Sequence, residues 1–305
     1  MKLVRVRPAV SLAVLLLAAA PALAACGDDS SGASPSTTAA AAASSTTGAS
    51  TTAPTTTAAP TTTLKTVRIM VTNDDGVDAP GLDSVVEGLR ALPAVEVVVV
   101  APSANQSGAG GKLSPAPPAV SDAKTASGYA AKAVAGTPAD TVVWAIDQKG
   151  LPARPDIVIS GSNIGQNLST VNMLSGTVGA ARAAGARGIP AIAVSQGLNA
   201  DTNADFVNGT KQFLAWFTQN RAKIASAATS DGSPAPVWSF NAPSCKVGAI
   251  RGIVEVANAT TGDGRDGATM DCGSTKTTFT DDIDAWNNGF AAVTQVPKDQ
   301  VLQKG

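Results

Sequence analysis

Alternating strand-like and helix-like segments constrain the fold of this chain more than any other feature. Four short runs are almost wholly apolar, as in strands buried on both faces of a sheet, and they span 67–72, 95–102, 155–161 and 190–196. Four further stretches have helix-like patterns, at 81–92, 138–146, 175–188 and 205–225. This order predicts an α/β fold with a doubly wound, Rossmann-like and mostly parallel sheet.

The character of the sequence changes after about residue 227. Strand-like runs now follow one another without a helix-like stretch between them, at 236–241, 249–258 and 289–297. A segment rich in Gly, Asp and Thr (260–280) separates the last two, and Asp281 and Asp282 are expected in a turn. We expect a C-terminal β-rich extension over about 228–296, formed as an antiparallel arm or hairpin on the main sheet.

The N-terminus has the pattern of an export signal. Three basic residues precede the apolar run 9–25, which is short for a helix that spans a membrane. This pattern predicts a lipoprotein signal peptide over 1–25, because the sequence LAAC at 23–26 resembles a bacterial lipobox, in which Cys26 is lipidated and becomes the mature N-terminus. The alternative is an ordinary cleaved signal. With the lipid anchor, the protein is expected outside the cytoplasm on a bacterial cell membrane.

A linker separates this anchor from the folded part. Residues 27–63 are almost all Ser, Thr, Ala, Gly and Pro, and such a composition has too little apolar surface to offset the entropy of ordering. We therefore expect the Cys anchor and a disordered linker over 26–63, and a single folded domain over 64–305.

Cysteine, histidine and charge counts exclude several classes of protein. In an exported chain, Cys245 and Cys272 are expected to form a disulfide, with two free thiols as the alternative. The sequence contains no histidine, which excludes a Ser-His-Asp triad, a phosphohistidine mechanism and a His-bound zinc. The 22 Lys and Arg residues balance 23 Asp and Glu residues, so nothing indicates nucleic-acid binding.

Polar loops follow three of the predicted strands. Asp74 and Asp75 follow the first of these strands, and the segments 103–108 and 160–167 follow two others. Ligands of open α/β sheets bind at such carboxyl ends. Two adjacent carboxylates repel each other unless a cation lies between them, and oxygen ligands suit Mg²⁺, Mn²⁺ or Ca²⁺. The alternative is that the pair forms a turn and caps the helix that begins near Gly81.

A second polar cluster, Ser175-Gly176-Thr177, opens a predicted helix. Free backbone N–H groups and small hydroxyls at a helix N-terminus form an anion site, although a plain helix cap explains the same residues. A metal site and an anion site together indicate phosphate ester chemistry.

Six motifs in order resemble the SurE family of survival-protein nucleotidases, over about residues 66–296. They are NDDG with APG (73–81), AP…NQSGAG (101–110), GTPADTV (136–142), RPDIVISGSNIGQN (154–167), SGTVGAA (175–181) and GIPAIAVS (188–195). The resemblance implies a metal-dependent phosphomonoesterase that hydrolyses nucleoside 5′- or 3′-monophosphates, and a homo-oligomer, dimer or tetramer, that exchanges its C-terminal arm.

The resemblance also implies a role for individual residues. It implies four metal ligands: Asp74, Asp75, Ser107 and Asn163. It implies six positions that contact the phosphate or substrate: Asn73, Gly108, Asn167, Ser175, Gly176 and Thr177. Asp74 and Asp75 are the expected catalytic residues, with Asp74 acting as both ligand and base for the attacking water.

Three departures from the family pattern leave other functions open. Asp78 stands where the family usually has His, Ala183 where it usually has Glu, and 103–108 reads SANQSG where the family has an Arg-rich loop. The alternatives are a lipoprotein that binds a nucleotide or phosphate without turnover, and a phosphatase for other esters.

Overall fold

The computed structural model describes residues 65–199, 204–262 and 270–297. Contacts divide the chain into Met1–Ala59 and Pro60–Gly305, and every element below belongs to the second unit. The predicted signal peptide, Cys26 and the linker lie outside the described residues. Within the described part, no helix is both long and apolar enough to cross a bilayer.

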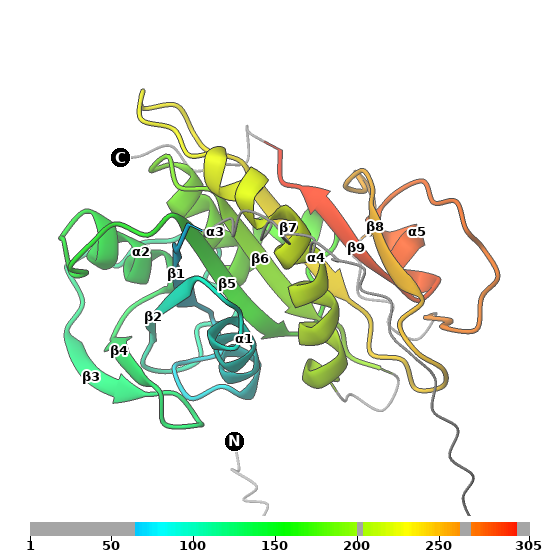
Figure 1. Cartoon of the computed structure of the whole chain (residues 1–305), viewed down its shortest axis with the longest axis horizontal. Coiled ribbons are helices and arrows are strands. Elements are labelled where there is room, and N and C mark those ends of the chain that lie inside the picture. The colour runs from blue at the N-terminus through cyan, green and yellow to red at the C-terminus, as the bar shows by residue number, and fades with distance from the viewer. Residues whose placement is uncertain (1–64, 200–203, 263–269, 298–305) are drawn as a thin grey trace, which may run out of the picture. The chain divides into compact units, whose positions relative to one another are not determined.

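One nine-stranded sheet carries the fold, in the order β3-β4-β2-β1-β5-β6-β7-β9-β8 (Figure 1). The strands are β1 (Val67–Thr72), β2 (Val95–Pro102), β3 (Val120–Lys124), β4 (Ala130–Val134), β5 (Ile157–Ile164), β6 (Ala191–Gln196), β7 (Val237–Ala242), β8 (Gly252–Glu255) and β9 (Phe290–Gln295). The strands from β4 to β7 in this order are all parallel. The α/β fold with a mostly parallel sheet is therefore confirmed.

Helices cover both faces of the sheet (Figure 1). On one face, α1 (Pro80–Arg90) packs beside α4 (Phe206–Ser226), and their buried side chains form one apolar core with the sheet. On the other face, α2 (Pro138–Ile146) packs beside α3 (Gly176–Gly185) over a second core. These two cores are the reason that the central strands are apolar on both sides.

Two strands on one side of the sheet were not predicted from the sequence. β3 reads VSDAK and pairs antiparallel with β4, which reads AAKAV. β3 has polar residues at its exposed positions, and β4 is rich in alanine, so neither has the β-branched or long apolar run that marks the central strands. Their pairing with the rest of the sheet decides their conformation.

The C-terminal extension differs in detail from the predicted arm. β7 pairs parallel with β6 and so belongs to the main sheet, whereas β9 is antiparallel to β7 and β8 is parallel to β9. A short helix, α5 (Asp282–Asn287), lies between β8 and β9. The expected turn at Asp281 and Asp282 is therefore wrong, because Asp281 caps this helix by accepting a 2.9 Å bond from the backbone N–H of Asp284.

Asp282, the first residue of α5, is fully buried and holds this region together. Its carboxylate accepts the backbone N–H groups of Ser169 at 2.9 Å and Ala259 at 2.8 Å. Ser169 begins the 3₁₀ helix η1 (Ser169–Met173), so Asp282 ties η1 to the segment that follows β8. Burial raises the pKa of Asp282, and these hydrogen bonds oppose the rise.

A disulfide joins Cys245, which follows β7, to Cys272, which precedes α5, with 5.8 Å between the Cα atoms. It links two segments that are separated by 27 positions in the sequence.

Replacing both Cys245 and Cys272 by serine should lower the free energy of unfolding by roughly 3–4 kcal/mol, because a loop of this length loses the constraint on its unfolded state. Urea denaturation followed by circular dichroism measures the change. Cys26→Ser, in the segment before the folded unit, is the control. An unchanged unfolding midpoint in the double variant would contradict the expectation.

Candidate active site

The candidate site lies where the order of the strands reverses. The chain passes from β1 outward to β2 on one side and later returns to β5 on the other, so β1 has parallel neighbours on both sides. The carboxyl ends of these three strands meet at one edge of the sheet, which is where ligands bind in open α/β folds. The three polar segments predicted from the sequence lie at this edge, although the structure extends β5 through Ile164, so 160–164 form the end of a strand rather than a loop.

A tight turn follows β1. Asn73 is fully buried, its Nδ2 donates to the carbonyl of Gly76 at 2.8 Å, and the N–H of Gly76 donates to Asn73 Oδ1 at 3.3 Å. Gly76 has φ +114°, a conformation that side-chain-bearing residues rarely adopt. The side chain of Asn73 thus closes this turn, and Asp74 and Asp75 lie within it. We call residues 73–76 the aspartate turn.

The two aspartates do not cap α1, so the alternative helix-cap role is wrong. Helix α1 follows Ala79, which makes no side-chain cap. Pro80 occupies the first turn of α1. Proline suits this position, because the N–H that it lacks would have no partner within the helix.

Asp74 is held by the N-terminus of α3. Its carboxylate is only 3% exposed, and Thr177 donates its hydroxyl to Oδ1 at 2.6 Å. Burial raises the pKa of Asp74, while the Thr177 hydroxyl and the backbone N–H groups of Thr177 and Gly176 act against the rise. Gly176 permits this approach, since a Cβ there would lie 2.8 Å from the Cβ and Oδ2 atoms of Asp74.

Asp75 is less buried and points toward two other loops. Its Oδ2 accepts the backbone N–H of Ile164 at 3.0 Å, and Asn105 donates Nδ2 to its Oδ1 at 3.3 Å. Burial raises its pKa to about 6; the bond from Ile164 opposes the rise and the charge of Asp74 adds to it. The two carboxylates therefore bind protons more readily than two separate aspartates would. A bound cation would replace these protons.

The loop that follows β2 is fixed to the same turn. The N–H of Gln106 donates to the carbonyl of Asp74 at 2.7 Å, and the N–H of Ser107 donates to Asn105 Oδ1 at 2.9 Å. Ser107 and Gly108 are exposed. Asn163, beside Ile164, donates its Nδ2 to the carbonyl of Gly165 at 2.8 Å, and no hydrogen bond reaches its amide oxygen from the described part of the chain.

These residues fit a hard cation by their chemistry. Two carboxylates, a hydroxyl and an amide oxygen are all oxygen donors, which suits Mg²⁺, Mn²⁺ or Ca²⁺. Among the described residues, no group of three or more His, Cys, Asp or Glu side chains could hold a metal. Neutral oxygens would therefore complete a site built on the two aspartates.

Two other predicted residues have structural partners. Asn167 is buried, its Nδ2 donates to Ser195 at 2.9 Å, and its backbone N–H donates to Asn241 at 2.7 Å, so it anchors its loop to β6 and β7. Ser175 caps α3 by accepting the N–H of Val178 at 3.2 Å. The contacts of Asn105, Ile164 and Thr177 with the aspartates were not predicted from the sequence.

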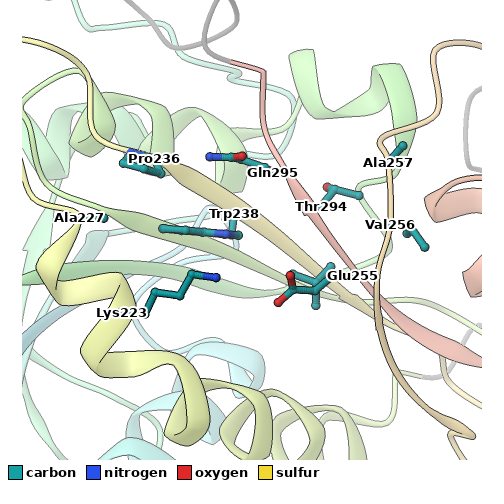
Figure 2. Close-up of a pocket in the computed structure, with 10 residues that line it drawn as sticks. Lys223, Ala227, Pro236, Trp238, Glu255, Val256, Ala257, Thr294 and Gln295 are labelled. Carbon is teal, nitrogen blue, oxygen red and sulfur yellow. The ribbon is translucent and has the colours of Figure 1, made fainter.

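Two cavities help to locate the substrate. One, of about 330 Å³, borders Asp75. A larger one, of about 560 Å³, lies between α4, β7, β8 and β9, with Lys223, Trp238 and Glu255 around it (Figure 2). The larger cavity borders the beginning of β7, at the opposite edge of the sheet from the aspartates, and includes none of the site residues. We therefore assign the candidate site to the smaller cavity and the Asp74–Asp75 turn.

Comparisons with known proteins give the same assignment of fold. The family profile described as "Survival protein SurE" matches residues 69–264. The protein named 5′-nucleotidase SurE from Methanocella arvoryzae is 39% identical over 177 residues, which are 58% of this chain and 66% of that protein. The protein named 5′-nucleotidase SurE 1 from Burkholderia lata is 49% identical over 137 residues, 45% of this chain and 51% of that protein.

The match thus spans about half to two thirds of the length of these relatives. The crystal structure of the SurE protein from Aquifex aeolicus superposes with a TM-score of 0.58 at 25% identity, covering 76% of this chain and 94% of that one. Because the family profile matches well over half of the chain, from β1 to beyond β8, the chain belongs to the SurE family.

Proposed function

We propose that this protein is a metal-dependent phosphomonoesterase that hydrolyses nucleoside 5′- or 3′-monophosphates. The observation that carries the proposal is the carboxylate pair Asp74–Asp75 at the end of β1, where the strand order reverses; the N-terminus of α3 holds Asp74, and Ile164 and Asn105 hold Asp75. The names of the relatives as 5′-nucleotidases support the substrate class.

In the proposed site, Asp74, Asp75, Ser107 and Asn163 would hold a divalent cation. When bound, it would supply positive charge for orienting the phosphate and for lowering the pKa of a water in the site. Ser107 and Asn163 suit this role because their side-chain oxygens accept no hydrogen bond from the described part of the chain, and because the loops that carry them are bonded to the aspartate turn.

The remaining polar groups position the reacting groups. Thr177 and the first backbone N–H groups of α3 fix the Asp74 carboxylate, and in the proposed mechanism this carboxylate orients the attacking water and accepts its proton. Asn73 shapes the turn, and Asn167 anchors the adjoining loop. Gly108 would supply its backbone N–H on the phosphate side. The first N–H groups of α3 already act on Asp74, so Ser175, Gly176 and Thr177 would favour the phosphate through the positive end of the helix.

Phosphate release from nucleoside monophosphates should require Mg²⁺ or Mn²⁺ and stop on chelation. Asp74→Asn should lower kcat at least about 100-fold, because it removes the base, and Thr177→Val should lower it about tenfold by freeing Asp74. Asp122→Asn, on exposed β3, is the charge-matched control with unchanged rate. Full turnover by Asp74→Asn with metal bound would exclude Asp74 as the base. Nucleotide binding without release under any metal would instead favour a binding protein.

Without metal, the stability of the folded protein should depend on Asp75. Its folded-state pKa of about 6 lies above the value of about 3.9 for an unfolded chain. The contribution of protonated Asp75 to the stability of the folded protein is thus fully present below about pH 4, and it is lost as the pH rises through about 6. The unfolding temperature of metal-free protein should fall over this range, and fall less in Asp75→Asn.

Metal should reverse this loss by binding the deprotonated form. Adding Mn²⁺ should raise the unfolding temperature of the native protein more at pH 7 than at pH 5, and Asp75→Asn should remove most of that rise. An equal rise at both pH values would contradict a role of Asp75 as a ligand.

We also propose that the enzyme is exported and held on the outer face of the bacterial cell membrane by lipid on Cys26. The basic start, the apolar run and the lipobox-like sequence support this. In cells, Cys26→Ser should move the protein from the membrane fraction to the soluble fraction, and labelled palmitate should mark the native protein but not the variant. Membrane retention of the variant would contradict a lipid anchor at Cys26. A homo-oligomer, dimer or tetramer, is the expected assembly.

A further inference from the structure

The cavity beside Asp75 contains groups that the chemistry above does not use. It is bordered by Asp75 in the aspartate turn, by residues 78–81 that follow this turn, by Asn105 and Ile164, and by Phe206 at the start of α4. Its volume of about 330 Å³ lies at the lower end of the range for small-molecule pockets, roughly 300–1,000 Å³. Because Asp75 borders both the proposed metal site and this cavity, the cavity adjoins the place where the phosphate of an ester would lie.

The walls of this cavity are mostly apolar. Ile164 is 51% exposed although it ends a central strand, and Pro80 is also exposed. The ring of Phe206 lies over Gly81, where a Cβ would come within 2.7 Å of it. An exposed aliphatic side chain and an aromatic ring that both line one cavity suit a flat organic group.

The charge of the cavity is negative. Asp75 and Asp78 border it, and no Lys or Arg of the described residues does so. Asp75 has hydrogen bonds from Ile164 and Asn105 and shares the proposed cation. Asp78 is exposed, and no described residue pairs with it or donates a hydrogen bond to it. Its carboxylate is therefore the uncompensated charge of this cavity, and it is available as an acceptor.

We propose that this cavity is the subsite for the organic group of the ester, and that Asp78 determines its specificity. Asp78 accepts hydrogen bonds from hydroxyl or amino groups of a neutral organic group, such as a nucleoside, and repels an organic group that bears a second phosphate. The enzyme therefore prefers nucleoside monophosphates to nucleoside bisphosphates. This inference rests on the proposed phosphomonoesterase function.

The test compares AMP with adenosine 3′,5′-bisphosphate, which differ by one phosphate on the organic group. In the native enzyme, kcat/KM should favour AMP. Asp78→Asn should reduce this preference about five- to tenfold, mainly through a lower KM for the bisphosphate, and Asp78→Lys should reduce it further. The effect should be smaller at 0.5 M salt, because the repulsion is screened. Asp122→Asn should keep the native preference.

A second variant tests the apolar wall without disturbing the charge. Ile164→Ala keeps the backbone N–H that binds Asp75 and should raise the KM for AMP about threefold or more, with little change in kcat. An unchanged preference in both Asp78 variants would overturn the role of Asp78, and an unchanged KM in Ile164→Ala would overturn the subsite.

Binding measurements separate failure of this inference from failure of the proposed function. Calorimetric titration of AMP and the bisphosphate into the same proteins, each also carrying Asp74→Asn to suppress turnover, gives their Kd values. If no protein releases phosphate but Asp78→Asn still tightens the bisphosphate about fivefold or more, the proposed function fails and the subsite is supported. If the native enzyme turns over and the Asp78 variants leave both Kd values unchanged, only the subsite fails. If neither nucleotide is hydrolysed or bound, both fail.

Discussion

The desolvated carboxylate of Asp74 is the constraint on which the rest of the site depends. A buried charge is costly unless hydrogen-bond donors surround it. Here the donors are the hydroxyl of Thr177 and the first backbone N–H groups of α3, whose positive end also favours an anion. This requires α3 to approach the aspartate turn closely, and Gly176 is needed because any side chain there would collide with Asp74.

The same close approach explains why α3 is rich in glycine and alanine. At Gly179, a Cβ would lie 2.0 Å from the carbonyl oxygen of Gly110, so the loop that follows β2 lies directly on the helix. That loop carries Asn105, which donates to Asp75, and Gln106, whose N–H donates to the carbonyl of Asp74. The close approach of Gly110 to Gly179 thus places this loop against both α3 and the turn that carries the two aspartates.

The central strands could be predicted because the residues of each segment alone indicate its structure. Segments such as 67–72 and 95–102 are apolar runs that only a strand buried on both faces explains, whereas β3 and β4 depend on their neighbours for their conformation. Helix α5 was missed because adjacent aspartates resemble a turn, although they also suit the first turn of a helix. The site residues could be named from their motifs, but the orientation of Thr177 could not. A helix N-terminus can bind a substrate phosphate or a carboxylate of the protein, and the spacing of SGT is the same for both.

The distribution of positive charge has a consequence for the strength of phosphate binding. Arg182, on α3, is buried and donates to the backbone carbonyl of Asn172 rather than to either aspartate. Arg187, near the far end of α3, pairs with Asp147. Among the described residues, no basic side chain is bonded to the aspartate turn or borders the cavity beside it. A phosphate dianion would therefore approach two carboxylates that have no basic side chain bonded to them among the described residues. In such a site the cation is the main source of attraction for the substrate, so metal binding and phosphate binding are strongly coupled, and each must weaken when the other is lost.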